Sequence, residues 1–263
     1  HGEPARFDEH YRENKIKNYW IDRMIELKNL SKRYGNLLAV DHLDLRVPKG
    51  EIFGFIGPNG AGKTTTINMM GGVLAPTSGA VMICGINMAD QPEQAKRKIG
   101  FIPDRPYLYE KLTGIEFLKF IADLYDVDED TFLKKSQEKL DMFFLSDRSN
   151  ELIESYSHGM KQRLVMAAAL LHDPEVIVVD EPMVGLDPLA IKMVKNLFKH
   201  LADEGVTIFL STHTLKVAED ICDKIGIIHK GTLIATGSYE DLRRDVHAEG
   251  ADLEQIFIRL TEP

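Results

Sequence analysis

The stretch Gly57-Pro-Asn-Gly-Ala-Gly-Lys-Thr64 decides the fold of this chain, because it matches the pattern G-x-x-x-x-G-K-[ST]. It follows the apolar run Ile52–Ile56, which predicts a buried strand, and it precedes residues 65–70, which predict a helix. This strand–loop–helix context distinguishes the pattern from a plain glycine-rich turn. The sequence therefore predicts a loop that binds the phosphates of a nucleoside triphosphate.

Each residue type in this loop has a physical role. Glycines let the backbone bend so that its N–H groups surround phosphate oxygens, and the following helix directs its positive N-terminal end at them. Lys63 is expected to reach the β- and γ-phosphates, and the Thr64 hydroxyl is expected to hold Mg²⁺. The predicted phosphate-binding residues are Gly57, Pro58, Asn59, Gly60, Ala61, Gly62, Lys63, Thr64 and Thr65.

Composition narrows the class of protein. A chain of 263 residues suits one large α/β domain or two closely joined subdomains. Its 32 Lys and Arg against 41 Asp and Glu give a net charge of −9, which argues against a broad nucleic-acid surface. The two cysteines, Cys84 and Cys222, predict buried free thiols.

No apolar run approaches the roughly 20 residues that span a bilayer, and the first twenty residues lack the apolar core of a signal peptide, so a cytoplasmic protein is expected.

The order of elements predicts a mostly parallel α/β core interrupted by a helical insert. Residues 1–23 are polar and begin without Met, so they are expected to be a tag-like or wrongly assigned extension. Residues 24–104 and 173–245 are assigned to the core, 105–172 to the insert, and 246–263 to a C-terminal helical segment. Strands are expected at 24–30, 39–47, 52–56, 80–84, 99–102, 176–179, 206–210, 224–229 and 232–235, and helices at 65–70, 92–98, 115–125, 129–144, 157–171, 188–203, 214–222 and 252–260.

Two further strands end in polar residues. The apolar run before Asp180 and Glu181 predicts a central parallel strand, and ligands gather at the carboxyl ends of such strands. Asp180 is expected to hold Mg²⁺, directly or through water, and Glu181 to orient and deprotonate an attacking water. The alternative is a solvated acidic turn. His213 closes the next strand and is expected to contact the γ-phosphate.

Residues 156–163, Tyr-Ser-His-Gly-Met-Lys-Gln-Arg, resemble the signature L-S-G-G-Q of the ATP-binding subunit of ABC transporters. The resemblance covers residues 24–242 and implies a P-loop NTPase core with a mostly parallel sheet, an N-terminal antiparallel β subdomain and an inserted α-helical subdomain. It also implies that two subunits close head-to-tail over two ATP molecules. In that arrangement Ser157, which caps a helix, and Gly159 grip the γ-phosphate held by the other subunit.

The resemblance assigns roles to other positions. It implies that Tyr34 stacks on the adenine, Glu181 is the catalytic base and His213 is a switch histidine. The segment Gly185-Leu-Asp187 resembles the loop that communicates across the dimer, although Asp187-Pro188 also predicts a simple helix start.

Two departures from the family pattern stand out. Asp104 occupies the position where the family usually has Gln, and it is expected to contact Mg²⁺ and the attacking water, directly or through a bridging water. His158 replaces a Gly and Met160 a Gln in the signature. The phosphate grip is expected to survive these changes, whereas contacts to the partner's ribose become doubtful.

The resemblance implies an ATP-hydrolysing subunit that powers a separate membrane permease from the inner face of the membrane, with features of the ABC-2 exporter subgroup. Phe117, Leu118, Phe120 and Ile121 are candidates for a docking groove, or simply core. The alternatives are a soluble ABC-type ATPase in DNA repair or translation, and a small-molecule kinase. The sequence does not identify the transported substrate, and it does not show whether the subunits form a homodimer or a heterodimer. The direction of transport follows only from the resemblance.

Overall fold

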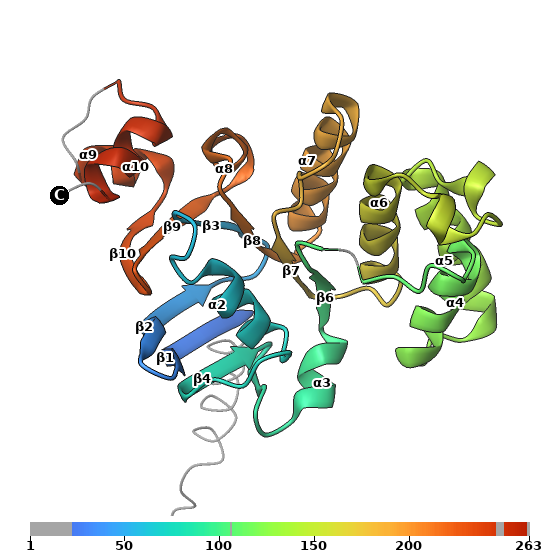
Figure 1. Cartoon of the computed structure of the whole chain (residues 1–263), viewed down its shortest axis with the longest axis horizontal. Coiled ribbons are helices and arrows are strands. Elements are labelled where there is room, and N and C mark those ends of the chain that lie inside the picture. Colours follow the sequence, from blue (N-terminus) through green and yellow to red (C-terminus); the bar gives the residue numbers. More distant parts are fainter. Residues whose placement is uncertain (1–22, 106, 246–249, 262–263) are drawn as a thin grey trace, which may run out of the picture.

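The computed structural model describes residues 23–105, 107–245 and 250–261 (Figure 1). The expected extension at residues 1–23 therefore lies outside the described residues except for Arg23. Two β-sheets and their helices form the core, and a group of helices lies beside it (Figure 1). Among the helices of the described ranges, none is long and apolar enough to cross a membrane.

The first sheet is antiparallel, with strand order β2-β1-β4-β5. Its strands are β1 (Ile25–Tyr34), β2 (Leu37–Val47), β4 (Ser78–Ile83) and β5 (Ile86–Asn87). Alternating apolar residues of β1 and β2 are buried against the core, as their period of two predicts. The two-residue strand β5 was not expected, because a segment this short has no measurable period.

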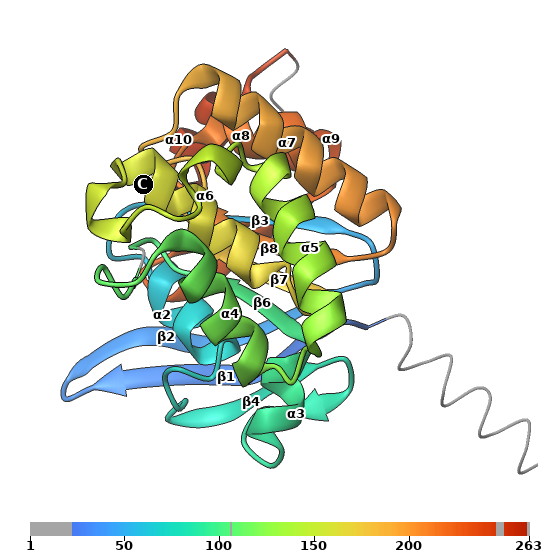
Figure 2. The ribbon, with the colours of Figure 1, turned by 90° about the vertical axis from the view of Figure 1, so that its right-hand side faces the viewer.

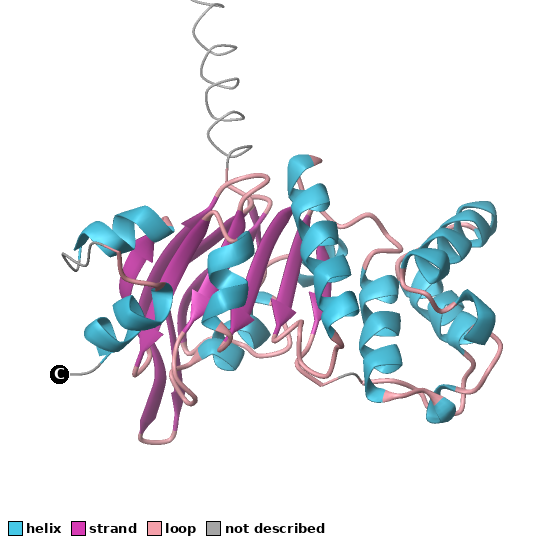
Figure 3. Ribbon diagram, turned by 90° about the horizontal axis from the view of Figure 1, so that it is seen from above, coloured by secondary structure: helices cyan, strands magenta, loops and turns pink. Residues whose placement is uncertain are grey.

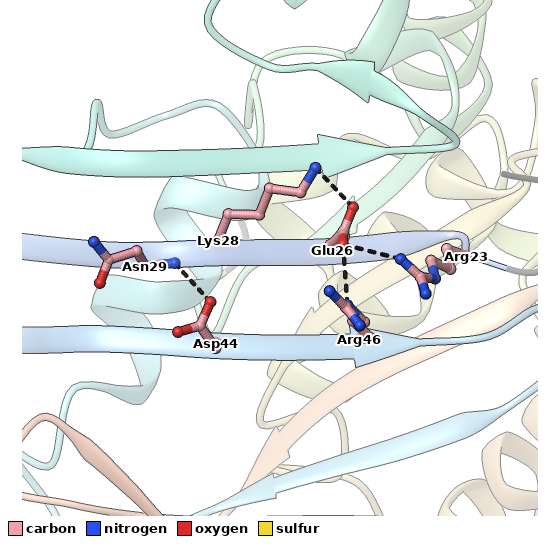
Figure 4. Close-up of polar contacts among 6 residues, drawn as sticks. All are labelled: Arg23, Glu26, Lys28, Asn29, Asp44 and Arg46. Carbon is pink, nitrogen blue, oxygen red and sulfur yellow. Dashed lines mark hydrogen bonds and ion pairs between the residues drawn. The ribbon is translucent and has the colours of Figure 1, made fainter. Parts of the chain in front are cut away.

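One carboxylate of this sheet is buried among cations (Figure 4). Glu26 on β1 accepts from Arg46 Nε at 3.0 Å and lies 3.0 Å from Lys28 Nζ and 3.4 Å from Arg23. Burial by itself would raise the pKa of Glu26, but Lys28 and Arg46 outweigh that effect and hold it below its ordinary value. Glu26 therefore remains charged and links β1 to β2.

The second sheet has strand order β10-β9-β3-β8-β7-β6 and is parallel except for the β9–β10 hairpin (Figure 3). Its strands are β3 (Ile52–Ile56), β6 (Ile99–Ile102), β7 (Val176–Asp180), β8 (Thr207–Thr212), β9 (Lys224–His229) and β10 (Thr232–Gly237). All residues of β3, β7 and β8 are buried, which agrees with strands covered on both faces. Their carboxyl ends lie at one edge of the sheet.

Helices cover both faces of this sheet. They are α2 (Lys63–Met70), α3 (Pro92–Arg97), α7 (Pro188–Asp203), α8 (Leu215–Ile221), α9 (Tyr239–Asp245) and α10 (Leu253–Thr261). Buried residues of α2 share one core cluster with the antiparallel sheet and one face of the parallel sheet, whereas α7 belongs to the cluster on the other face. Helix α9 was not expected, because its seven residues include only one buried apolar side chain, Leu242.

The helical region, as we call residues 107–172, contains α4 (Gly114–Leu124), α5 (Glu129–Met142) and α6 (His158–Ala169) (Figure 2). Thr113 caps α4, since its side chain and that of Glu116 form a capping box. The helix expected to continue to residue 144 ends at Met142, because Phe144 has a φ of +54°. Phe117 and Leu118 are buried, so they belong to the core and not to a docking surface.

The two cysteines are free thiols, as expected, but each is only partly buried. Burial raises the pKa of the Cys84 thiol to about 12 and also raises that of Cys222. Both thiols are therefore protonated and unreactive at neutral pH.

Candidate nucleotide site

The phosphate loop follows β3, and its glycines are required for two different reasons. A Cβ on Gly57 would lie 2.4 Å from the Ile228 carbonyl oxygen, and a Cβ on Gly62 would lie 2.5 Å from that of Ala39. These two positions have no room for a side chain. Gly60 has open space around it but a φ of +79°, which L-residues rarely adopt.

Lys63 is the first residue of α2 and is 8% exposed. Its Nζ donates to the carbonyl oxygens of Gly57 at 2.7 Å and Pro58 at 3.2 Å. Burial lowers the pKa of Lys63, while the charges of Glu181 and Asp180 oppose that shift. The ammonium group is thus held inside the loop by weak neutral acceptors, which a phosphate can replace with stronger charge-assisted bonds.

The two predicted carboxylates have different surroundings at the end of β7. Asp180 is 2% exposed and accepts from the Ser211 hydroxyl. Glu181 has a φ of +51°, and its backbone N–H donates to the Ser211 carbonyl oxygen at 3.1 Å. A non-glycine residue in this left-handed conformation costs about 1–3 kcal/mol and is typical of functional sites. Asp180 is therefore fixed within the sheet edge, and Glu181 begins the connection to α7.

His213 follows β8 and lies directly opposite Glu181. Its Nδ1 is 2.8 Å from Glu181 Oε1, and its side chain is more exposed than that of the glutamate. This contact joins the ends of two neighbouring parallel strands. The carboxylate and the imidazole are therefore held together at one point of the molecule.

An open cleft of about 530 Å³ collects most of the predicted site residues. Tyr34 lies at its rim, is 47% exposed and has Lys32 Nζ 5.4 Å from its ring centroid. Three lining residues were not expected, Leu37, Ala39 and Val184, although an exposed Leu37 in the β1–β2 hairpin is a signal for a contact surface. The residues that line this nucleotide cleft are Tyr34, Leu37, Ala39, Asn59, Gly60, Gly62, Lys63, Thr64, Thr65, Asp104, Glu181, Val184 and His213.

The signature segment, residues 156–163, does not line that cleft. Ser157 is exposed and caps α6, its Oγ accepting from the Met160 N–H at 3.3 Å, as predicted. Gly159 lies against the 181–187 loop, because a Cβ there would be 3.2 Å from the Gly185 carbonyl oxygen. A Cβ on Gly185 itself would lie 2.2 Å from His158 Cδ2. The signature segment and the loop after Glu181 therefore pack together as one surface.

Oxygen donors suited to Mg²⁺ lie in and beside the cleft. Among the described residues, no group of three or more His, Cys, Asp or Glu could hold a metal ion alone. Mg²⁺ does not require such a group, since it usually takes one or two carboxylates together with substrate phosphates and water. The Thr64 hydroxyl and the Asp104 carboxylate line the cleft, whereas Asp180 is buried outside that lining, directly before the lining residue Glu181. These oxygens are donors of this kind, so the residues fit an ion held jointly with phosphate.

Comparison with known proteins identifies the family of this chain. Residues 40–184, more than half of the chain, match the protein family described as ABC transporter. The chain belongs to the ABC transporter family. Bacitracin transport ATP-binding protein BcrA of Bacillus licheniformis is 40% identical over 225 residues, which cover 85% of this chain and 72% of BcrA. The predicted family is therefore confirmed.

Solved structures confirm the predicted fold. The structure of an ATP binding subunit of an ABC transporter matches with a TM-score of 0.86 at 37% identity, covering 90% of this chain and 99% of that chain. The dimeric ATP-binding cassette MJ0796, in a post-hydrolysis state bound to ADP and Pi, matches with a TM-score of 0.73 at 28% identity, covering 82% and 98%. This ABC transporter family member is thus an ATP-binding subunit and an ATPase.

Proposed function

We propose that two copies of this chain, or this chain and a paralogue, close head-to-tail over two ATP molecules and drive a separate membrane permease by hydrolysis. The observation that carries the proposal is the separation of two half-sites within one chain. Lys63, Glu181 and His213 line the nucleotide cleft, whereas Ser157 lies on a different, exposed surface. A capped helix N-terminus attracts anions, so Ser157 suits a phosphate presented by another subunit.

In this proposal ATP occupies the whole length of the nucleotide cleft. The triphosphate lies along residues 57–65, where backbone N–H groups and Lys63 bind its oxygens. Tyr34 stacks on the adenine, an interaction that contributes about 1–3 kcal/mol per base. Mg²⁺, held by Thr64, Asp180 and Asp104, would neutralise phosphate charge when bound.

Hydrolysis in this proposal depends on Glu181 and His213. Glu181 accepts the proton of the attacking water, and the 2.8 Å contact with His213 supports a fixed orientation of its carboxylate. His213 contacts the γ-phosphate and stabilises the charge that develops there. Asp104, exposed at the rim after β6, orients the attacking water.

We assign permease docking to the exposed aromatic surface of the helical region. Tyr107 and Tyr109 are exposed, and Tyr109 makes an edge-to-face contact with Phe120, with ring centroids 5.3 Å apart. Exposed aromatic residues are typical of surfaces that bind another protein. Of the four docking residues proposed from the sequence, Phe120 and Ile121 stay candidates, because neither is buried.

An exporter at the cytoplasmic face of the membrane is the form of transport that we propose. The support is the resemblance of the signature segment to the ABC-2 subgroup and the transport name of the relative BcrA. Neither observation favours DNA repair or translation. We also propose the subdomain boundaries 24–104 and 173–245 for the core, 105–172 for the helical part and 246–263 for the C-terminal segment.

The proposal is tested with Glu181→Gln, which keeps the size of the side chain but removes its basicity. ATP binding should persist, turnover should fall by roughly 10²–10⁴-fold, and the variant should form an ATP-dependent dimer in sedimentation velocity experiments. Glu204→Gln, an exposed substitution outside the cleft, is the control. Wild-type turnover in Glu181→Gln would refute the assigned base, and copurification without any polytopic membrane protein would refute the transport role.

A further inference from the structure

The C-terminal helix α10 forms one wall of a second cleft beside the phosphate loop. This α10 cleft encloses about 250 Å³ and is lined by Gly57, Pro58, Asn59, His213, Leu215 and Phe257. Asn59 and His213 also line the nucleotide cleft, so the two hollows belong to one continuous surface. A segment more than 40 residues beyond His213 in sequence therefore lies beside the phosphate loop.

Helix α10 is firmly attached, which makes Phe257 a fixed part of this surface. Leu253 and Ile256 are fully buried in a cluster with Leu242 of α9 and Ala218 of α8 (Figure 1). The Tyr239 hydroxyl donates to the Ala251 carbonyl oxygen at 2.6 Å and ties the start of α10 to α9. The next residue after Ile256, Phe257, is only half-buried and lies at the cleft.

The proposed dimer determines what approaches this cleft. Within one copy, His158 and Gly159 pack on Gly185, so the 181–187 loop and the start of α7 must move with the signature segment. When the signature segment of a second copy reaches the phosphate loop, that loop arrives beside it. Leu189, two residues after the Asp187 cap, is 72% exposed and brings an apolar side chain to this surface.

We propose that Leu189 of a second copy of this chain docks into the α10 cleft against Phe257 and Leu215, which makes α10 part of the ATP-dependent dimer interface. This inference rests on the proposed function, because the cleft is covered only when two copies close over ATP. An exposed leucine and a half-buried phenylalanine are both removed from water in the closed dimer. Burying the apolar area of these two side chains favours association of the two copies.

The test is carried out in the Glu181→Gln background, where ATP should hold the dimer. Leu189→Ser is expected to weaken ATP-dependent dimerisation roughly tenfold in sedimentation equilibrium, because a buried leucine is lost from the interface. The exposed position of Leu189 makes this variant safe for folding. Phe257→Ser should have a similar effect, whereas Ile258→Ser, on the same helix but outside the cleft lining, should leave dimerisation unchanged.

A cysteine pair gives a second readout. A mixture of Leu189→Cys and Phe257→Cys chains should form a covalent heterodimer under mild oxidation with ATP and Mg²⁺, but not with ADP. If Glu181→Gln itself stays monomeric with ATP, both this inference and the dimer of the proposed function are overturned. If Glu181→Gln dimerises, yet Leu189→Ser and Phe257→Ser dimerise equally well and no disulfide forms, only the α10 interface is overturned.

Discussion

The two half-sites of this chain differ in burial and in the way they are held. Lys63 and Asp180 are almost fully buried and are fixed by the carboxyl ends of central strands. Ser157 and His158 are exposed at the start of one helix, and His158 is supported through the 181–187 loop. In the proposed dimer, the first half-site binds nucleotide within one chain, whereas the second acts on the nucleotide of the partner.

Removing the charge of the buried half-site should have the largest effect. The ammonium group of Lys63 is already desolvated, so it can bind phosphate with little further loss of hydration. Lys63→Ala removes this group. ATP affinity, measured by isothermal titration calorimetry, should fall roughly a hundredfold, which corresponds to about 2.7 kcal/mol. Lys134→Ala, which removes an exposed lysine of α5, is the control and should bind ATP normally.

Gly185 contacts His158 where the two half-sites meet, and this position should tolerate a methyl group poorly. Gly185 has a φ of +77° and its Cβ would lie 2.2 Å from His158 Cδ2, so Gly185→Ala combines backbone strain with a clash. We expect stability to fall by about 2 kcal/mol in urea unfolding, together with weaker ATP-dependent dimerisation.

Two variants separate the causes of this effect. Gly35→Ala places a methyl group at a φ of +54° with no atom within 4 Å, so it reports the backbone cost alone. The double variant His158→Gly with Gly185→Ala removes the clashing ring and should recover part of the loss. Equal effects of Gly35→Ala and Gly185→Ala would show that His158 packing is unimportant.

Acid should weaken the attachment of the helical region to the core through His172. This ring stacks on Tyr125 with centroids 3.7 Å apart, and its Nε2 is 3.1 Å from the Ile99 carbonyl oxygen. Burial, opposed by the bond to Ile99 and by Asp173, lowers the pKa of His172 to about 4, below the ordinary 6.5. The unfolded chain therefore takes up a proton between these values while the folded chain does not.

The sign of the pH effect follows from this difference. The contribution of neutral His172 is complete above pH 6.5 and is lost as the pH falls towards 4. As the pH falls from 7.5 to 5, this loss should lower the free energy of unfolding by about 2 kcal/mol. His172→Phe keeps the stacked ring but cannot titrate, so it should lose less stability over this range than the wild type. Identical pH profiles would contradict the prediction.

The smallest effect is expected at the exposed half-site. Ser157→Ala removes the side-chain acceptor for the Met160 N–H and should cost about 1 kcal/mol of stability. ATP binding to the single chain should not change, whereas dimerisation with ATP should weaken several-fold. Ser157→Asn keeps a capping oxygen and should restore stability, which separates the cap from any contact with the partner's phosphate.

Local patterns predicted much of the site. The phosphate loop, the strand that ends in Asp180, and the caps at Ser157 and Asp187 each lie within a segment of eight residues or fewer. Their hydrogen bonds and dihedral angles are therefore encoded in short segments. The structure of such segments can be predicted without knowledge of the rest of the chain.

Other features depended on distant segments and could not be predicted in this way. The sequence left Phe117 and Leu118 open as a docking groove or as core, and they are core, because α5 and α6 cover that side of α4. The short elements β5 and α9 have too few residues for a periodic pattern. His158 packs against Gly185, and Phe257 lies in the α10 cleft beside the phosphate loop. Both arrangements bring together segments from different parts of the chain.

The sequence by itself determined the class of chemistry, since a glycine-rich loop with a lysine and a strand ending in two acids are typical of proteins that bind a nucleoside triphosphate and cleave its terminal phosphate. Only the tertiary structure decided which of these residues meet. The strand order placed His213 against Glu181 and left Ser157 outside the cleft. The physical reason is that backbone preferences act over a few residues, whereas distances between elements depend on how all the apolar faces pack together.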